Sequence, residues 1–344
     1  MEVKKMKAIG LLEYLPIENE NSLIDIEIPR PVPHEKDLLI KINAISVNPV
    51  DVKVRSPKPQ KEANPKILGW DASGVVVEVG ADCTLFKPGD EVFYAGSITK
   101  PGTYSEYHVV DERLVGKKPK SLTNAESAAI PLTAITAWEG LFERLGIEPE
   151  NKDKNKSKSI LIIGGAGGVG SIAIQLAKWA GLHVIATASR NETREWVKNL
   201  GADYIINHHK PFKEQLLELQ INDVDYIFCL NNTDQHWHGM GESIKPQGKI
   251  CSIVENEHPL ELNILKSKSA TFVWEFMFTK AMYQTDDMIL QHNLLNKVSE
   301  LLDQGMIKTT LNQTLTPINA ENLRKAHTLI ESGRTIGKIV LERF

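Results

Sequence analysis

A short apolar run followed by a glycine-rich turn constrains the fold of this chain more than any other feature. Residues 160–163 read Ile-Leu-Ile-Ile, apolar on both faces, as in a central strand of a parallel sheet. The turn carries Gly165, Gly167 and Gly170 in the spacing G-x-G-x-x-G, and residues 171–180 have the composition of a helix. This order predicts a dinucleotide-binding unit, because the glycines let a pyrophosphate approach the helix N-terminus. A plain glycine-rich turn is the alternative.

The end of the next predicted strand indicates which dinucleotide this unit binds. Residues 183–187 form that strand, and Ser189 and Arg190 follow it, where a site for NAD usually has an acidic residue. A hydroxyl and a guanidinium suit a 2′-phosphate, and Arg194 is placed one helical turn further on to join them. We therefore predict NADPH rather than NADH. In the alternative interpretation Ser189 only caps the following helix, which still leaves Arg190 available.

Strands and helices alternate after residue 181, as in a doubly wound parallel sheet. The predicted strands are 204–206, 224–230 and 248–254, and the predicted helices are 212–219 and 233–244. Ligands of such sheets lie beyond the carboxyl ends of the strands, so we expect Leu230, Asn231 and Val254 near the cofactor. The aromatic residues 271–278 predict a core strand, a subunit interface or a wall of the substrate pocket.

The chain before and after this region has a different pattern of residues. Up to about Pro119 it is β-rich, with closely spaced apolar runs and turn residues, which predicts a small barrel or sandwich. These runs are residues 6–12, 38–47, 74–79, 91–94 and 104–110. Further predicted elements are helices at 124–130 and 134–142, an exposed loop at 148–159, helices at 286–304 and 319–332, and a strand at 338–342.

Composition excludes several classes of protein. At 344 residues the chain exceeds one ordinary domain, and its net charge of -4 gives no general attraction to nucleic acid or anionic lipid. The three cysteines, Cys83, Cys229 and Cys251, have no paired spacing, which fits a reducing cytosol. No apolar run reaches the ~20 residues that span a bilayer. We expect a cytoplasmic protein with no nucleic-acid or membrane partner.

Six motifs spread over the chain are shared with one known family. In chain order they are Asn48-Pro-Val-Asp51, Leu68-Gly-Trp-Asp-Ala-Ser-Gly74, Phe86-Lys-Pro-Gly-Asp-Glu-Val92, Pro131-Leu-Thr-Ala-Ile-Thr-Ala-Trp138, the glycine loop with Gln175, and Gly333-Arg-Thr-Ile-Gly-Lys-Ile-Val340. Through them the chain resembles the medium-chain dehydrogenase/reductase superfamily, in its zinc-free quinone oxidoreductase branch. More narrowly, it resembles the bacterial proteins named zinc-type alcohol dehydrogenase-like.

The resemblance implies a GroES-like catalytic domain, residues 1–130 with a C-terminal return at 284–344. An α/β Rossmann domain for NADP, residues 131–283, would be inserted between them, with the active site in the cleft. Asn48 and Tyr94 become candidate catalytic residues, Asn48 as a donor to the substrate carbonyl and Tyr94 as a pocket residue and proton relay. The residues that the family pattern places at the cofactor are Asn48, Thr133, Gly165, Gly167, Gly168, Val169, Arg334 and Lys338. A homodimer or homotetramer is also implied.

The zinc ligands of an alcohol dehydrogenase are missing from the sequence. Catalytic zinc needs Cys, His and Cys or carboxylate side chains that converge on one site. The segment with the family's first cysteine here reads Ser46-Val-Asn48, and the family's Gly-His-Glu reads Gly69-Trp70-Asp71. The pairs His208-His209 and His236-Trp-His238 remain, and we interpret them as surface or helix-end histidines. We predict no metal.

The absence of zinc ligands limits the chemistry that we expect. Without a Lewis acid, nothing strong stabilises the alkoxide that forms from a simple ketone. A quinone or an α,β-unsaturated carbonyl spreads the charge over a conjugated system. We therefore expect an NADPH-dependent oxidoreductase that acts on such a small-molecule substrate. A zinc-dependent alcohol dehydrogenase and a non-catalytic NADPH-binding protein remain as alternatives.

Overall fold

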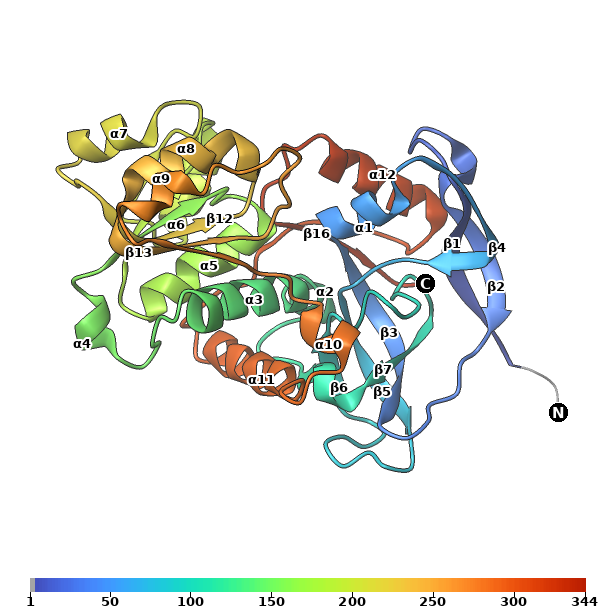
Figure 1. Cartoon of the computed structure of the whole chain (residues 1–344). Helices are drawn as coiled ribbons and strands as arrows, with labels where there is room; N and C mark the ends of the chain where they lie inside the picture. Colours follow the sequence, from blue (N-terminus) through green and yellow to red (C-terminus); the bar gives the residue numbers. More distant parts are fainter. Residues whose placement is uncertain (1–3) are drawn as a thin grey trace. The chain divides into compact units, whose positions relative to one another are not determined.

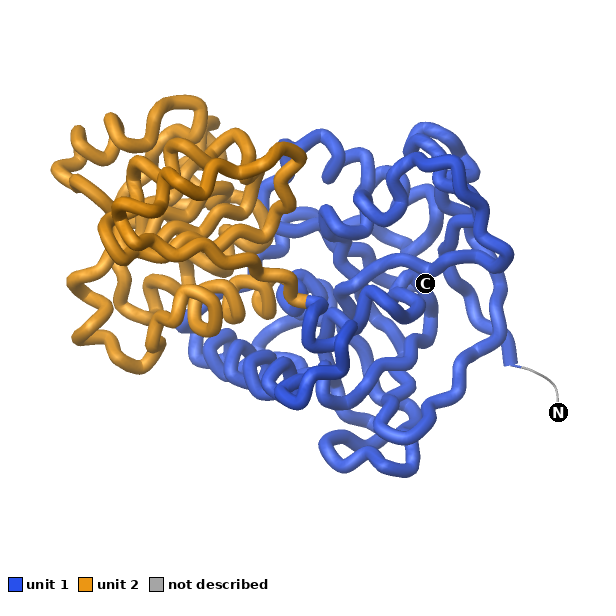
Figure 2. Tube along the Cα trace, viewed as in Figure 1, with its two compact units in different colours: residues 1–132, 278–344 blue, residues 133–277 orange. Residues whose placement is uncertain are grey.

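The computed structural model describes residues 4–344, which divide into two compact units (Figure 2). Unit 1 contains the chain up to Leu132 and Phe278–Phe344, and unit 2 is Thr133–Met277. The predicted domain boundaries, 130/131 and 283/284, differ from these by a few residues. Helix α10 (Thr279–Tyr283), which the prediction assigned to the nucleotide-binding domain, belongs to unit 1.

Unit 2 is built on one parallel sheet in the order β11-β10-β9-β12-β13-β14. Its strands are β9 (Ser159–Ile163), β10 (His183–Thr187), β11 (Tyr204–Ile206), β12 (Val224–Cys229), β13 (Ile244–Ser252) and β14 (Thr271–Trp274). Its helices are α3 (Pro131–Trp138), whose first two residues belong to unit 1, with a π-helical continuation η3 (Glu139–Arg144), α4 (Lys152–Asn155), α5 (Gly168–Trp179), α6 (Asn191–Asn199), α7 (Phe212–Glu218), α8 (Thr233–Ser243) and α9 (Asn263–Lys266). Helices flank the sheet on both faces (Figure 1). The predicted doubly wound sheet is confirmed.

Strand β9 lies inside the sheet because every one of its apolar side chains can be buried. It pairs with β10 on one edge and β12 on the other, and residues 160–163 have no exposed side-chain surface. Leu161 and Ile163 join the core formed with β12, β13, α7 and α8. A continuous apolar run at this position is what a strand covered on both faces requires.

Unit 1 contains a seven-stranded sheet and a three-stranded sheet. The larger sheet has the order β15-β16-β3-β5-β6-β8, with β7 also paired to β3, and the smaller one has the order β2-β1-β4. The strands are β1 (Lys5–Tyr14), β2 (Ile24–Pro29), β3 (Asp37–Val47), β4 (Lys58–Ile67), β5 (Ala72–Val79), β6 (Glu91–Tyr94), β7 (Tyr107–Asp111), β8 (Val115–Lys117), β15 (Leu311–Leu315) and β16 (Lys338–Glu342). The helices, besides α10, are η1 (Glu20–Ser22), α1 (Pro49–Arg55), η2 (Glu112–Leu114), α2 (Asn124–Ala128), α11 (Leu290–Asp303) and α12 (Ala320–Glu331).

The last strand of the chain pairs with a strand near its beginning. In the antiparallel pair of β16 and β3, Ile339 lies opposite Val47. Lys338 opens β16 and Asn48 directly follows β3, so this register brings two predicted site residues together. The β-rich N-terminal part and the C-terminal return therefore build one GroES-like unit, as predicted.

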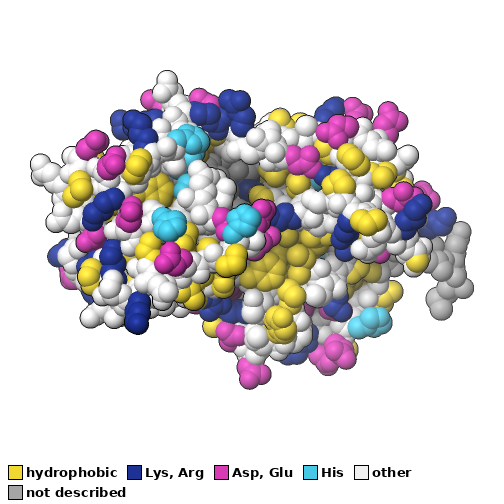
Figure 3. Space-filling model, turned by 45° about the horizontal axis from the view of Figure 1, so that its top comes forward, with side chains coloured by type: hydrophobic (Ala, Val, Ile, Leu, Met, Phe, Trp, Pro, Cys, Tyr) yellow, Lys and Arg dark blue, Asp and Glu magenta, His cyan; other side chains and the backbone are white. Residues whose placement is uncertain are grey.

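The surface shows no extended area of one charge on the face in view in Figure 3. Basic and acidic side chains are interspersed there, in agreement with a net charge of only -4. Within residues 4–344, no helix combines the length and the apolarity that crossing a membrane requires.

Candidate functional site

The glycine loop of unit 2 shows which of its glycines the protein itself requires. A Cβ on Gly170 would lie 2.3 Å from the carbonyl oxygen of Gly164, and one on Gly165 would lie 3.0 Å from Cβ of Ala186. A Cβ on Gly167 would meet nothing closer than 3.6 Å, and its backbone angles (φ -72°, ψ 175°) suit any residue. Gly167 therefore leaves open space at the N-terminus of α5, where an incoming phosphate would find unpaired N–H groups.

Predicted cofactor residues of unit 2 gather at the carboxyl ends of its strands. Leu230 N donates to Ile163 O at 3.0 Å, and a Cβ on Gly164 would lie 3.4 Å from Cβ of Asn231. Gly168 and Val169 form the first turn of α5 in the same loop. At the end of β13, the carbonyl of Val254 accepts from the hydroxyl of Thr233. The structure thus brings these residues to one edge of the sheet.

The segment after β10 is shaped by the start of α6. Arg190 is the N-cap residue of this helix, and its backbone N–H donates to Thr193 Oγ1 at 3.1 Å. Ser189 therefore does not cap the helix, and both Ser189 and Arg190 are half-buried at the strand end. Nη1 of Arg190 lies 3.3 Å from Oε1 of Glu192, and the exposed Arg194 follows one turn later. An anion at Arg190 must compete with the Glu192 carboxylate.

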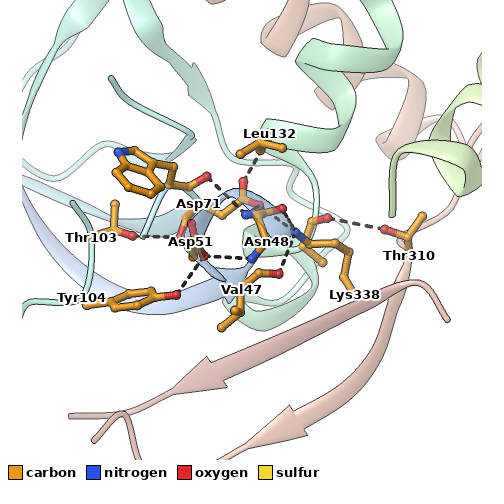
Figure 4. A network of polar contacts seen from close by, with 11 residues as sticks. Val47, Asn48, Asp51, Asp71, Thr103, Tyr104, Leu132, Thr310 and Lys338 are labelled. Carbon is orange, nitrogen blue, oxygen red and sulfur yellow. Dashed lines mark hydrogen bonds and ion pairs between the residues drawn. The ribbon is translucent and has the colours of Figure 1, made fainter. Parts of the chain in front are cut away.

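In unit 1, Asn48 and Lys338 belong to a buried polar network (Figure 4). Nζ of Lys338 lies 3.0 Å from Oδ2 of Asp71 and 3.3 Å from the carbonyl oxygen of Val47, and it also donates to Oδ1 of Asn48. The side chains of Lys338 and Asp71 are 4% and 0% exposed. The ammonium group therefore has three oxygen acceptors, so the desolvated cation is compensated.

Asp71 connects this ion pair to the rest of unit 1. Its Oδ2 accepts from Nδ2 of Asn48 at 2.9 Å, and its Oδ1 accepts from the backbone N–H of Leu132 at 2.8 Å. Burial raises the pKa of Asp71, and the nearby Lys338 opposes that rise. The side-chain oxygen and nitrogen of Asn48 are thus both engaged, and its amide points at Asp71 in this structure.

A second buried carboxylate, Asp51, belongs to the same network as Asp71, because both accept hydrogen bonds from Asn48. Its Oδ2 accepts from the backbone N–H of Asn48 and from the hydroxyl of Tyr104, both at 2.8 Å. The Tyr104 oxygen lies 3.2 Å from Nε2 of His327, and because its hydroxyl donates to Asp51, this contact is a hydrogen bond when Nε2 carries the imidazole proton. Burial raises the pKa of Asp51 to about 7 and, with Arg55, lowers the pKa of His327 to about 3.

Asp51→Asn is expected to change how stability depends on pH. Because the folded pKa of Asp51 is raised to about 7, the folded state loses stability as the pH rises from about 4 through 7. The asparagine removes this loss, which we expect to be a few kcal/mol at about pH 8. Urea unfolding at pH 5 and pH 8 measures it. Asp153→Asn, at a 94% exposed side chain, is the control, and an equal pH dependence in both variants contradicts the expectation.

Two other predicted residues lie outside these hydrogen-bonded groups. Tyr94 is fully buried, and its hydroxyl donates to Nδ1 of His108 at 3.1 Å. Nε2 of His108 donates to Pro101 O at 2.9 Å, and burial lowers the pKa of His108 to about 4. His108 lines a cavity of about 860 Å³, which Tyr94 does not line. Arg334 is exposed in the turn before β16.

The donor set of this network does not fit zinc. Within residues 4–344, no three His, Cys, Asp or Glu side chains are arranged to hold a metal ion. Trp70, at the place of the family's histidine, donates its indole N–H to Ser97 O at 3.1 Å. The Asp71 carboxylate already accepts from Lys338, Asn48 and the Leu132 backbone. Convergent ligands with one open position, which catalytic zinc needs, are not present among these residues.

Comparison with known proteins supplies the family. Models of the alcohol dehydrogenase GroES-like domain and of zinc-binding dehydrogenase match residues 34–120 and 168–290. A zinc-type alcohol dehydrogenase-like protein of Staphylococcus epidermidis is 43% identical over 98% of this chain and 99% of its own length. The chain belongs to the medium-chain dehydrogenase/reductase superfamily. It is thus a member of an oxidoreductase family whose members bind nicotinamide cofactors.

Solved structures agree with this placement in the superfamily. A protein from Rhizobium etli CFN 42 assigned to the zinc-dependent alcohol dehydrogenases is 48% identical, with a TM-score of 0.95 over 100% of this chain and 99% of that one. The quinone oxidoreductase from Coxiella burnetii is 27% identical, with a TM-score of 0.80 over 99% of this chain and 100% of that one. Quinone oxidoreductases are therefore among the structural neighbours of this superfamily member.

Four residues of the unit 1 network had no assigned role from sequence. They are Asp51, Asp71, Tyr104 and His327. Asp71 and Asp51 lie inside shared motifs, but the sequence relates Asp71 only to the missing zinc site and predicts no role for Asp51. No local sequence pattern indicates a role for Tyr104 or His327, because their contact joins residues far apart in the chain.

Proposed function

We propose that this protein is an NADPH-dependent reductase that transfers hydride to a quinone or an α,β-unsaturated carbonyl without zinc. The open space over Gly167, at the N-terminus of α5, is the observation that carries the cofactor assignment. When bound, the cofactor supplies the hydride from its nicotinamide ring. The contacts of Asn48, Thr133, Arg334 and Lys338 with it remain predictions.

The choice of NADPH over NADH rests on the residues after β10. Ser189 and Arg190 stand where an acidic residue would hold the 2′-hydroxyl of NADH. The guanidinium of Arg190 offers a planar set of donors that suits a 2′-phosphate. Glu192, whose carboxylate contacts Arg190, has a side chain that is 59% exposed, so solvent weakens this ion pair.

The charges in unit 1 support the proposed substrate class. The cation of the buried network, Lys338, is already neutralised by Asp71. The network therefore contains no uncompensated positive charge that would stabilise an isolated alkoxide. A conjugated acceptor needs less electrostatic stabilisation, because the negative charge left by hydride attack spreads over several atoms. This favours quinones and enones over simple ketones and alcohols.

Two alanine substitutions in the glycine loop are expected to differ in their effects on stability. Gly170→Ala would place Cβ 2.3 Å from a backbone oxygen, so we expect a loss of roughly 1–3 kcal/mol of stability. Gly167→Ala has room in the protein, so its stability should stay within about 1 kcal/mol of wild type or rise. Its affinity for NADPH should nevertheless fall, because the methyl group fills the space for the pyrophosphate. Unchanged NADPH affinity in a stable Gly167→Ala variant contradicts the cofactor assignment.

An acceptor panel tests the proposed reaction. NADPH and NADH oxidation is followed with small quinones, enones, saturated ketones and, in reverse, alcohols. We expect turnover with the conjugated acceptors and a preference for NADPH. Turnover only with saturated ketones or alcohols would refute the proposed substrate class. Tight NADPH binding without oxidation by any acceptor would favour a non-catalytic binding protein.

The expected homodimer or homotetramer also remains a proposal. Strand β14 is at the edge of the unit 2 sheet; Trp274, its last residue, is 42% exposed, and Phe276, two residues further on, is 45% exposed. An edge strand flanked by exposed aromatic side chains suits pairing with a second copy. Of the interpretations of residues 271–278, the subunit interface is therefore the one we propose.

A further inference from the structure

Three histidines of unit 2 lie close together and have no role in the proposal so far. Asn207 follows the end of β11, and His208 and His209 come next in the chain. The ring centroids of these two histidines are 4.2 Å apart. His236, in the first turn of α8, packs against Phe212 with ring centroids 5.3 Å apart. His208 is half-buried, His209 is exposed, and His236 is only 4% exposed.

The sheet places the turn with His208 and His209 next to the segment with Arg190. Strands β10 and β11 pair in parallel, with Thr187 opposite Ile206, and Ala188 N donates to Ile206 O at 2.9 Å. Because both strands run in the same direction, the chain leaves both at the same edge of the sheet. The residues that follow β10 and β11 therefore start out as neighbours, on the side where such sheets bind ligands.

The turn is held in place by its own hydrogen bonds. Oδ1 of Asn207 accepts from His209 N at 2.9 Å, and its carbonyl oxygen accepts from Lys210 N at 3.1 Å. Gln215 of α7 binds Asn207 twice, donating from Nε2 to its carbonyl at 2.9 Å and accepting from its N–H at 2.8 Å. The two imidazoles are thus presented by a fixed turn.

We propose that His208 and His209 form a proton-gated part of the binding site for the 2′-phosphate of NADPH, beside Arg190. This inference rests on the proposed function, since it requires NADPH as the cofactor. Arg190 would bind the phosphate at every pH, whereas the imidazoles become cationic donors only when they are protonated. The preference for NADPH over NADH would then increase in mildly acidic solution.

The surroundings of the histidines set the direction of the pH effect. Burial and the neighbouring His209 lower the pKa of His208, and burial with both neighbours lowers the pKa of His236 to about 4. The titratable groups that act on one another here are His208 and His209 from the turn and His236 from α8. Lys213 and Glu214 lie on α7, whose Gln215 holds the turn, and the segment with Arg190 follows the neighbouring strand β10. A bound phosphate dianion reverses the balance and favours the imidazolium, so affinity should rise as the pH falls.

Calorimetric titration with 2′,5′-ADP and 5′-AMP tests this without turnover. For the wild type, we expect the affinity ratio of the two nucleotides to rise roughly fivefold to tenfold between pH 8 and pH 6.5, since one unit of pKa shift corresponds to about tenfold. The lower limit keeps most of the phosphate in its dianionic form, since its second pKa is about 6. In His208→Gln/His209→Gln the ratio should not rise. His183→Gln, at the exposed first residue of the same β10, should behave as wild type.

The outcomes separate this inference from the proposed function. If the double variant keeps the wild-type rise while Arg190→Ala abolishes the preference for 2′,5′-ADP, the histidine inference is wrong and the NADPH assignment stands. If the wild type binds both nucleotides equally at every pH, the NADPH assignment itself fails. His236→Gln should keep the rise, because the buried His236 remains neutral in this range. The exposed His209→Gln alone, expected to fold normally, should reduce the rise.

Discussion

Lys338→Met is expected to lower the free energy of unfolding by roughly 3–5 kcal/mol, because it leaves Asp71 charged and buried without its cation. The side chain of Asp71 is 0% exposed, and Nζ of Lys338 lies 3.0 Å from its Oδ2. Protonation of Asp71 would relieve part of this cost. Burial already raises its pKa, and loss of Lys338 raises it further, so the destabilisation should be smaller at pH 5 than at pH 8.

A double-mutant cycle measured by urea unfolding separates the ion pair from simple packing. Asp71→Asn with Lys338→Met removes both charges at once and should cost clearly less than the sum of the two single substitutions. Lys325→Met, at a 57% exposed lysine paired with Glu321 on α12, is the matched control and should change stability by less than about 1 kcal/mol. If Lys338→Met were as mild as this control, the network would not hold unit 1 together as described.

Arg190→Ala is expected to weaken NADPH binding by about 10–100-fold and to leave NADH binding nearly unchanged. A hydrogen bond to a charged group contributes about 1.5–3 kcal/mol, and each 1.4 kcal/mol corresponds to about tenfold. Only NADPH carries the phosphate that the guanidinium binds. Fluorescence titration of both reduced cofactors measures the effect.

Glu192→Gln is the matched counterpart of Arg190→Ala. Oε1 of Glu192 lies 3.3 Å from Nη1 of Arg190, so the carboxylate competes with the phosphate for the same guanidinium. Removing its charge should strengthen NADPH binding modestly, by about twofold to fivefold for an exposed pair worth up to ~1 kcal/mol. Equal losses for NADPH and NADH in Arg190→Ala would show that this residue does not recognise the 2′-phosphate.

The parts of the fold that sequence predicts well are those with a strong local pattern. Residues 160–163 predict β9 because an apolar strand of this kind has to be central. The glycine spacing predicts the loop and the start of α5, although this helix begins at Gly168, ahead of residue 171. The parallel sheet follows because each strand is followed by a helix.

Other elements lack such a pattern. Strand β4 (Lys58–Ile67) is polar, contains Pro59 and Pro65, and lies at the edge of its sheet beside β1, so its sequence does not resemble a core strand. Helix α1 has seven residues and depends on its capping box between Asn48 and Asp51. Residues 148–159, predicted as an exposed loop, contain α4, where Nδ2 of Asn155 binds the carbonyls of Glu148 and Ala180.

The candidate site is harder to predict than the fold because its contacts join distant segments. Lys338 and Asn48 meet only through the pairing of β16 with β3, which no local pattern indicates. His208 and His209 appear in the sequence as an isolated pair. Their turn lies next to the segment with Arg190 because β11 pairs with β10. The family resemblance predicts Asn48 and Lys338 as site residues, whereas their hydrogen bonds with Asp71 are seen only in the structure.

Zinc-independent hydride transfer is the central claim, and one measurement tests it most directly. The protein is treated with a chelator, its metal content is measured by mass spectrometry, and NADPH oxidation by a quinone or enone accepted in the panel is then followed with and without added zinc. We predict the same rate in both samples, with far less than one metal ion per chain. Activity that appears only after zinc is restored would contradict the account.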